Sequence, residues 1–353
     1  MNRRARIAII GAGWWATEWH IPSVLANPDA DLVALVDTNP DRLARAAQHY
    51  QVARTYSSAQ TLLDAEPLDG AIVVTNHATH YAVARLCLER DLHVLIEKPM
   101  VLYARDGRTL VELAAARGKQ LLVGHTWNFL PFIRQASDLV QRGALGAIQA
   151  VNCQYNSNIL GFLQGSDEHQ PRTVHGPGSA YANPALSGGG HAHTQLTHII
   201  GLLFHVTGLR PERVNALMDN HALTVDLVDA MLVRFQGGAL GTVSGVGNLA
   251  GEPTLLLRLD IFCEGGRVEI SAFPTQCTVR SADGSVQELV TQAEGMPGYP
   301  ASAPANNLVD VILGRADNLS PGESGWRAAE LLDAAYRSAA QDGQVIQIKD
   351  LYR

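Results

Sequence analysis

The sequence contains little cysteine and no Cys-x-x-Cys pair. Its four cysteines lie far apart along the chain, at Cys87, Cys153, Cys263 and Cys277. Disulfide frameworks and zinc knuckles need cysteines at short, regular spacing. We therefore expect neither, and we interpret these residues as buried free thiols of a protein in the reducing cytoplasm.

Two further absences narrow the class of protein. There is no block rich in Lys and Arg, and the formal net charge is −7, which argues against a general affinity for nucleic acid or an anionic membrane. No stretch approaches the roughly 20 apolar residues that span a bilayer. The apolar run at 6–10 is short and leads directly into a glycine-rich turn, so it is interpreted as a strand and not as a signal peptide. With 353 residues, 46% hydrophobic and 17% charged, the chain is expected to fold into two domains.

The first 125 residues alternate β-rich runs with helical patterns. Strands are predicted at 6–10, 32–37, 71–75, 93–96 and 121–124, and helices at 41–50 and 104–117. Continuous apolar strands that alternate with helices are typical of a parallel sheet covered on both faces. We predict an α/β fold in which residues 1–125 form a doubly wound, dinucleotide-binding Rossmann domain.

The pattern changes in the second part of the chain. Two hairpins, two helices and one long loop are predicted there, at 231–235 with 239–244, 255–262 with 267–270, 191–207, 325–340 and 156–187. Glycine pairs mark the turns of both hairpins. We therefore predict an α+β domain over residues 126–353, built on a large, mostly antiparallel sheet.

A glycine turn follows the first predicted strand. Its sequence, GAGWWA, matches the GxGxxG/A pattern of dinucleotide-binding domains. The first glycine allows the tight turn, the second lets the backbone approach a pyrophosphate, and the third small residue allows close packing of helix on strand. We expect this turn to bind the cofactor through Gly11, Gly13, Trp14, Trp15 and Ala16. Trp19, further along the predicted helix, is expected in the core.

Asp37 ends the second predicted strand, 24 residues after Gly13. A carboxylate at this place accepts hydrogen bonds from the adenosine ribose hydroxyls and repels a 2′-phosphate, which favours NAD over NADP. Arg42 and Arg45 are close enough in sequence to oppose this preference.

The tripeptide Glu97-Lys98-Pro99 ends the strand predicted at 93–96. A lysine there points into the crevice in which ligands of parallel sheets bind. Together with the glycine turn and Asp37, this tripeptide makes the chain resemble the glucose–fructose oxidoreductase, inositol dehydrogenase and rhizopine catabolism (Gfo/Idh/MocA) family over nearly its whole length. The motifs that carry the resemblance are GAGWWA, VALVD at 33–37, TNHATH at 75–80, EKP, GALG at 143–146, SGGG at 187–190 followed by His198, and AAYRSA at 334–339.

The resemblance implies roles for individual residues. Lys98 would contact both the nicotinamide and the substrate hydroxyl, and Glu97 would contact the cofactor ribose. The phosphate and nicotinamide-ribose side would be lined by Thr75, Asn76 and His80. The second domain would supply the substrate contacts and a back-to-back interface, so a homodimer or homotetramer is expected.

The chain departs from a pattern that many family members carry, D-x-G-x-H-x-x-D after the glycine run. His198 is retained, whereas Thr194 and Gly201 stand in place of the two carboxylates, and Asn128 stands in place of an arginine. A base must take the proton when a secondary alcohol is oxidised, and a histidine gains from a partner that fixes its ring. Thr194, one helical turn before His198, would orient the ring without supplying charge. Lys98 would then carry more of the proton transfer.

Other side chains are assigned to the substrate side or considered as metal ligands. Trp127 offers a face on which a sugar can stack, and Tyr155 offers a polar group compatible with a polyol. Four further histidines, His175, His191, His193 and His205, raise the alternative of a metal site. Zinc sites usually draw on carboxylates, thiolates or a compact HxxxH, none of which the predicted helix at 191–207 has, so no metal is expected.

These observations favour an NAD-dependent dehydrogenase that acts on a secondary hydroxyl of a sugar, sugar derivative or cyclitol. Lys98, His198 and Thr194 are the expected catalytic residues, and Lys98, Trp127, Asn128, Tyr155, Thr194 and His198 the expected substrate contacts. Two alternatives stay open at this point. One is an enzyme that retains NAD through a cycle of transient oxidation, giving hydrolysis, elimination or epimerisation. The other is a non-enzymatic sensor of dinucleotide or sugar.

Overall fold

The first sheet is parallel and has six strands. The computed structural model describes residues 3–166, 174–251, 255–272, 274–290 and 299–353. The strands follow the order β3-β2-β1-β4-β5-β6. Their bounds are β1 Ala5–Ile10, β2 Ala30–Val36, β3 Thr55–Tyr56, β4 Gly70–Val73, β5 His93–Ile96 and β6 Leu121–Val123. The order reverses between β1 and β4, and ligands of such sheets bind at that switch point, beyond the carboxyl ends of the strands.

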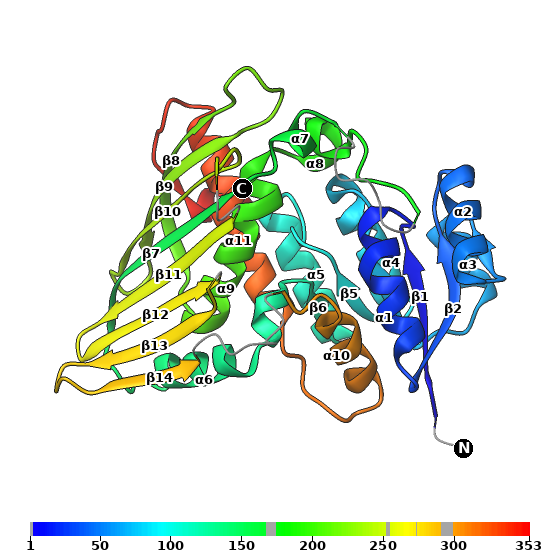
Figure 1. Cartoon of the computed structure of the whole chain (residues 1–353), viewed down its shortest axis with the longest axis horizontal. Coiled ribbons are helices and arrows are strands. Elements are labelled where there is room, and N and C mark those ends of the chain that lie inside the picture. Colours follow the sequence, from blue (N-terminus) through cyan, green and yellow to red (C-terminus); the bar gives the residue numbers. More distant parts are fainter. Residues whose placement is uncertain (1–2, 167–173, 252–254, 273, 291–298) are drawn as a thin grey trace.

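Helices cover both faces of this sheet, because its strands are apolar on both sides. Ile7 and Ile9 of β1 belong to one buried layer, and Ala8 and Ile10 belong to the other. The first layer contains α1 Ile21–Ala26, α2 Pro40–Tyr50 and α10 Ala303–Ile312. The second contains α3 Ala59–Ala65, α4 His80–Glu89 and α5 Ala104–Ala116. The doubly wound arrangement predicted from the sequence is confirmed. Figure 1 also shows that α10, from near the end of the chain, returns to this sheet.

The second sheet is large and mostly antiparallel, as predicted. Its nine strands follow the order β14-β13-β12-β11-β7-β10-β9-β8-β15, and only the β7–β10 pair is parallel. The bounds are β7 Ile148–Ser157, β8 Pro211–Asp219, β9 Val228–Phe235, β10 Leu240–Val246, β11 Leu255–Cys263, β12 Gly266–Ala272, β13 Gln276–Ser281, β14 Val286–Val290 and β15 Ile346–Gln347. Both predicted hairpins, β9–β10 and β11–β12, are present in this sheet.

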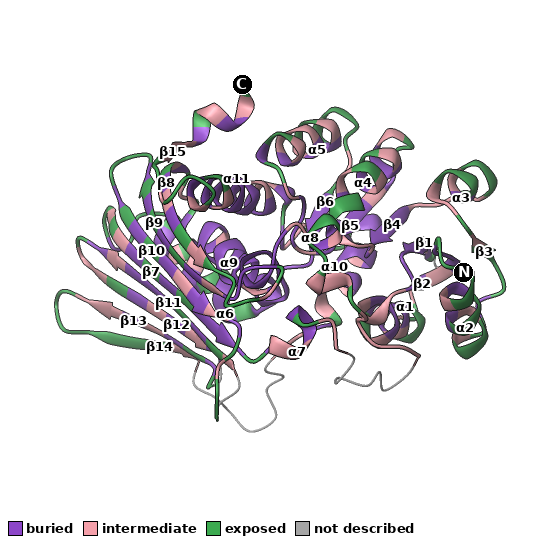
Figure 2. Ribbon diagram, turned by 90° about the horizontal axis from the view of Figure 1, so that it is seen from above, coloured by how far each residue is buried: buried purple, intermediate pink, exposed green. Residues whose placement is uncertain are grey.

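One face of the second sheet packs on helices, and the other is open. The helices α6 Pro131–Gln141, α9 Thr197–Thr207 and α11 Gly322–Ala339 contribute to the core under the inner face. They lie between the second sheet and the first (Figures 1 and 2). Along β9, Met231 and Val233 are buried, whereas Leu232 between them is 59% exposed. This alternation is what a strand with one covered face requires.

The expectation of a long loop at 156–187 is wrong in part at 156–166 and 174–187, and its residues 167–173 lie outside the described ranges. After β7 the chain forms two short helices and a 3₁₀ turn, which are α7 Leu160–Leu163, α8 Pro184–Ser187 and η4 Ala180–Ala182. The Asn183 side chain accepts from the Ala185 N–H at 3.0 Å, and Pro184 occupies the first turn of α8. These are ordinary helix-start features, but a four-residue helix is too short for periodicity to reveal.

Two helices begin with π-helical turns that the sequence patterns do not show. The turn η1 spans Ala16–His20 before α1, and η5 spans Ala192–Leu196 before α9. Trp19, on the first of these turns, is 40% exposed and packs against Trp15 with the two rings tilted by 49°, so its expected place in the core is wrong. All four cysteines are free and buried, as expected. No helix within the described ranges is long and apolar enough to cross a membrane.

Candidate active site

The glycine turn has the shape needed to receive a dinucleotide. Gly11 has φ 103°, and a Cβ at this position would lie 2.5 Å from the carbonyl oxygen of Val74, so only glycine fits there. At Gly13, by contrast, a Cβ would meet nothing within 4 Å. One glycine is thus enclosed by the protein, and the next presents an open backbone at the start of a helix. This cradle fits a pyrophosphate, because helix starts attract anions.

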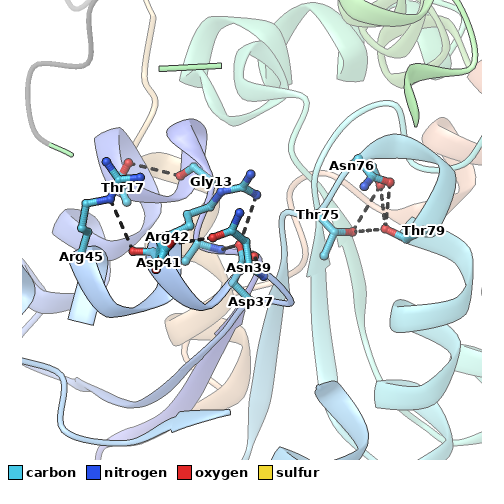
Figure 3. Close-up of polar contacts among 11 residues, drawn as sticks. Gly13, Thr17, Asp37, Asn39, Asp41, Arg42, Arg45, Thr75, Asn76 and Thr79 are labelled. Atoms are coloured by element: carbon cyan, nitrogen blue, oxygen red, sulfur yellow. Dashed lines mark hydrogen bonds and ion pairs between the residues drawn. The ribbon is translucent and has the colours of Figure 1, made fainter. Parts of the chain in front are cut away.

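Asp37 is fixed beside the glycine turn. Its Oδ2 accepts from the Ala12 N–H at 2.9 Å, its Oδ1 accepts from the Asn39 N–H at 2.8 Å, and Nη1 of Arg42 lies 3.5 Å from Oδ2 (Figure 3). The carboxylate therefore supports the turn as well as facing the place expected for the adenosine ribose. The Arg42 side chain stays 43% exposed and close to this place.

Beyond β4, the predicted cofactor residues divide into an accessible group and a buried one. The Thr79 hydroxyl donates to the Thr75 hydroxyl at 2.8 Å and also contacts Asn76 (Figure 3). His80 is fully buried beneath them. Its ring nitrogens lie 2.8 Å from the Pro99 carbonyl and 3.1 Å from the Thr75 carbonyl. His80 thus links the ends of β4 and β5, while Thr75 and Asn76 remain partly exposed at the cofactor side.

Lys98 lies at the carboxyl end of β5 and points toward α9. Its Nζ donates to the backbone carbonyl of Thr194 at 3.0 Å, within the π-helical turn η5. The Lys98–Pro99 peptide bond is cis. Burial lowers the pKa of Lys98 to about 8, and the negative charge of Glu97 opposes that lowering. An amine with this pKa can both release and accept a proton near neutral pH.

Glu97 is held by groups of the first domain. Its Oε1 lies 2.9 Å from Nε2 of His20 and 3.1 Å from Nε1 of Trp15, and its Oε2 accepts from the Lys98 N–H at 3.1 Å. Burial acts to raise the pKa of this carboxyl, but the His20 hydrogen bond and the charges of His20 and Lys98 outweigh burial and lower it. The structure shows these protein donors around the carboxylate, and the expected contact of Glu97 with a cofactor ribose stays a prediction.

The His198 ring packs against three aromatic side chains. Tyr155 stacks on it with 5.9 Å between ring centroids and 13° between planes, and Trp127 meets it edge-on at 5.2 Å. Tyr299 lies 6.1 Å away and also contacts Trp127. Burial, with the charges of Lys98 and His125, lowers the pKa of His198 well below its usual value. The ring is therefore neutral at pH 7 and is a weaker proton acceptor than Lys98.

Thr194 meets the site through its backbone. Its hydroxyl donates to the Gly190 carbonyl, and its own carbonyl accepts from Lys98. The Gly190 N–H and Ala192 N–H donate to Asp226 at 2.7 and 2.8 Å, and Asp226 also accepts from the Tyr336 hydroxyl at 2.7 Å. Among the described residues, the Thr194 hydroxyl forms no hydrogen bond with the His198 ring, so the expected orienting role of this side chain stays a prediction.

Asn128, one of the expected substrate contacts, is fully buried. Its Nδ2 donates to the Ser320 hydroxyl at 3.1 Å. This bond ties the segment after β6 to the loop before α11, which leaves the amide little freedom to reach a substrate. The predicted substrate contact at Asn128 therefore gains no support from its hydrogen bonding.

The four histidines considered as metal ligands lie in different surroundings. Nδ1 of His191 is 2.9 Å from Asp229, and His193 stacks on Tyr336 with ring centroids 4.4 Å apart. His205 lies in the last turn of α9, and His175 lies near the backbone of Ala12. The absence of a metal remains a prediction.

Three groups at the site were not found by sequence reasoning. His125 is buried and packs against Gly201, and burial lowers its pKa to about 3. Tyr299 reaches His198 from a distant part of the chain, and His20 reaches Glu97 across 77 residues. For His125, the neighbouring Gly-His in GHTWN was an available signal. The other two contacts are long-range and leave no spacing pattern.

Comparison with known proteins agrees with this geometry. The parallel sheet, glycine turn and lysine at a strand end define a dinucleotide-binding Rossmann protein with a second α+β unit. Residues 5–125 match the family model of the Gfo/Idh/MocA oxidoreductases, NAD-binding Rossmann fold, and residues 133–269 match the Gfo/Idh/MocA C-terminal domain. These matches cover more than half of the chain, which therefore belongs to the Gfo/Idh/MocA oxidoreductase family.

Individual relatives are distant in sequence. D-xylose 1-dehydrogenase [NADP(+)] of Haloarcula marismortui is 27% identical over 46% of each chain. Trans-1,2-dihydrobenzene-1,2-diol dehydrogenase of Bos taurus is 23% identical over 67% of this chain and 66% of the relative. The aligned region thus spans about half to two thirds of the length of these curated relatives.

Solved structures share the fold over almost the full chain. An oxidoreductase domain protein from Kribbella flavida has a TM-score of 0.81 at 20% identity, covering 98% of this chain and 100% of its own. An inositol dehydrogenase homologue complexed with NAD+ from Azotobacter vinelandii has a TM-score of 0.78 at 19% identity, covering 98% of each chain. At these identities the likeness concerns the fold alone.

Proposed function

We propose that the protein is an NAD-dependent dehydrogenase that oxidises a secondary hydroxyl of a sugar, sugar derivative or cyclitol, or catalyses the reverse reduction. The observation that carries this proposal is the position of Lys98. Its amine lies at the carboxyl end of β5, in the crevice where ligands of such sheets bind, and bridges to η5 of the second sheet's helix layer. Relatives named as dehydrogenases of xylose and of a cyclic diol support the reaction class.

The dinucleotide, which the glycine turn would hold through its pyrophosphate, would supply the nicotinamide that accepts the hydride. The protein's own part is to handle the hydroxyl proton. Lys98, with a pKa of about 8, is the group in the site best matched to accept that proton. His198 is neutral and buried against Tyr155 and Trp127, so it is suited to hold the hydroxyl by a hydrogen bond. We assign the proton to Lys98 and not to His198 because Thr194 and Gly201 provide no carboxylate that would stabilise a protonated His198 ring.

The lining favours a substrate that has an apolar face beside its hydroxyls. Trp127, Tyr155 and Tyr299 surround His198, and aromatic rings of this kind stack on the C–H faces of sugar rings or on unsaturated rings. We propose a cyclic polyol as substrate, and cyclic diols belong in the test panel because several relatives are named for them.

The test is turnover with NAD or NADP and a panel of sugars, sugar acids, inositols and cyclic diols, followed by the absorbance of the reduced nicotinamide. Lys98→Ala should lower kcat by about 10²–10⁴-fold, the usual contribution of a positioned proton acceptor, while NAD affinity changes little. Lys119→Ala, a lysine outside the site, is the matched control. Turnover retained in Lys98→Ala would contradict the proposal.

We further propose that copies of the chain associate through the open face of the second sheet. Leu217, Leu232, Leu240 and Val345 are each more than half exposed on this side of the molecule. Exposed apolar patches of this kind mark interaction sites. Light scattering on the wild type and on Leu232→Glu would show whether the oligomer depends on this face, and an unchanged mass would contradict it.

A further inference from the structure

Glu97 is surrounded on all sides in a way that fixes its carboxylate. His20 and Trp15 both aim ring nitrogens at Oε1, and the Lys98 N–H binds Oε2. On the remaining side is the backbone of Gly124, where a Cβ would lie 2.6 Å from Oε1. The carboxylate has no room to swing toward a different partner without breaking these contacts.

Among the described residues, the His20 side chain has no polar contact other than Glu97. His20 is fully buried, and its Nδ1 has no hydrogen-bond partner within the described part of the chain. A proton on Nε2 serves the carboxylate, whereas a proton on Nδ1 would be a buried unpaired donor, which is costly. The π-helical turn η1 is what brings His20 and Trp15 to the same carboxylate oxygen, since the wider turn places residues five apart above one another.

Glu97 carries the charge that acts on Lys98, although its carboxylate forms no ion pair with the Lys98 amine, which binds the Thr194 carbonyl. The imidazoles that couple to Lys98 come from four elements or segments and are His77, His80, His125 and His198. Burial lowers the pKa of each of them, so all four are neutral when Lys98 titrates. The Thr194 carbonyl contributes a dipole but no net charge. Among the described residues that affect Lys98, only Glu97 therefore carries a counter-charge.

We propose that His20 is a positioning residue which, together with Trp15, holds the Glu97 carboxylate in place as the counter-charge of Lys98. The proposal rests on the proposed function only in giving Lys98 its role in turnover. It implies that the glycine-turn helix, which is expected to hold the cofactor, also controls the proton affinity of the lysine. Loss of the His20 donor should release or protonate Glu97, and Lys98 should then hold its proton less firmly.

Competitive acetylation of lysine, read by mass spectrometry as a function of pH, measures the protonation of Lys98 directly. The chain has three lysines, Lys98, Lys119 and Lys349, and exposed Lys349 serves as the internal reference. In His20→Leu the titration of Lys98 should move to lower pH. A displacement of about one pH unit would raise its neutral fraction about tenfold at a pH below both pKa values. His20→Gln, which keeps a donor near the Nε2 position, should stay close to the wild type.

Two further variants keep the proposal testable if His20→Leu does not fold. Glu97→Gln removes the counter-charge and should move the Lys98 titration further in the same direction. Trp15→Phe removes one of the two side-chain donors and should give a smaller displacement. In the double variant His20→Leu/Glu97→Gln, the effect should equal that of Glu97→Gln alone, because His20 acts through the carboxylate.

An unchanged Lys98 titration in folded His20→Leu would overturn the proposal. If His20→Leu does not fold, an unchanged titration in both single variants, Trp15→Phe and Glu97→Gln, would overturn it. These measurements need neither substrate nor cofactor, so they separate the inference from the proposed function. If Lys98→Ala keeps its turnover while His20→Leu still displaces the Lys98 titration, the proposed function fails and the positioning role of His20 stands.

Discussion

The ring of His125 occupies the space in front of the Cα of Gly201. A Cβ at residue 201 would lie 2.5 Å from the nearest atoms of that ring, so this helix position accepts glycine and no larger residue without movement. The family resemblance led us to expect a carboxylate at this position, where the sequence has Gly201. The buried ring of His125 therefore fills the space that a carboxylate side chain at residue 201 would need.

Gly201→Ala should destabilise the protein although alanine is the better helix former. Forcing a methyl group into a packed site costs about 1–3 kcal/mol, which exceeds the gain of about 1 kcal/mol in helix propensity. Urea unfolding measures the change. In the background of His125→Ala, which removes the ring, the same substitution should cost much less. Equal costs in both backgrounds would show that His125 does not set the requirement for glycine.

Asp37 should govern the choice between NAD and NADP. Its carboxylate is fixed by the Ala12 and Asn39 N–H groups and would repel a 2′-phosphate, while Arg42 would attract one (Figure 3). We expect Asp37→Asn to reduce the preference for NAD by about tenfold, which corresponds to ~1.4 kcal/mol. Fluorescence titration with both dinucleotides measures this. Exposed Asp41→Asn is the control, and an equal loss of preference there would point to net charge instead of the position of Asp37.

Tyr155 should keep the His198 ring in its working orientation. The two rings stack within 13° of parallel, and pairs of this kind contribute about 0.5–1.5 kcal/mol. Tyr155→Leu should therefore reduce kcat/KM about 2–10-fold, the factor that this energy corresponds to. Tyr155→Phe keeps the ring and should remain near the wild type. A comparable loss in Tyr155→Phe would instead assign the effect to the hydroxyl.

Much of the fold could be predicted because its signals are local. The strand at 93–96 is predicted at the bounds that the structure has, since three apolar residues, Val94, Leu95 and Ile96, stand between polar His93 and Glu97 and are fully buried. The hairpins followed from their glycine pairs, and Gly237 and Gly238 indeed have φ of 86° and 100°. The helices α6 and α10 were missed, although both have a proline in their first turn.

The candidate site could be predicted only as far as its motifs reach. Lys98 and the glycine turn were found because strand ends and turns have characteristic sequences. The contacts that define their surroundings are long-range: Tyr336 reaches Asp226 across 110 residues, and Lys98 reaches the Thr194 backbone across 96. A backbone acceptor and a π-helical turn leave no residue type to read, so the hydrogen bond from Lys98 to the Thr194 carbonyl could not be predicted.

Buried histidines should make the folded protein sensitive to mild acid. Burial lowers the pKa of His125 to about 3 and those of His191, His193 and His205 to about 4, whereas unfolded histidine titrates near 6.5. A folded-state pKa below the unfolded value contributes stability that is present above pH 6.5 and is lost as pH falls towards the folded value.

At pH 5 a histidine whose folded-state pKa is about 3 or 4 should cost about 2 kcal/mol relative to neutral pH, which is a large part of the stability of an ordinary domain. Buried Asp229, whose pKa burial raises, opposes this loss by retaining its proton in the folded state. Thermal unfolding between pH 7 and 5 should show a steep fall in Tm. His205→Gln should flatten it, because one fewer proton is taken up on unfolding, whereas exposed His221→Gln should leave the slope unchanged. A Tm that is constant over this range would mean that the buried rings titrate normally or that unfolding does not expose them.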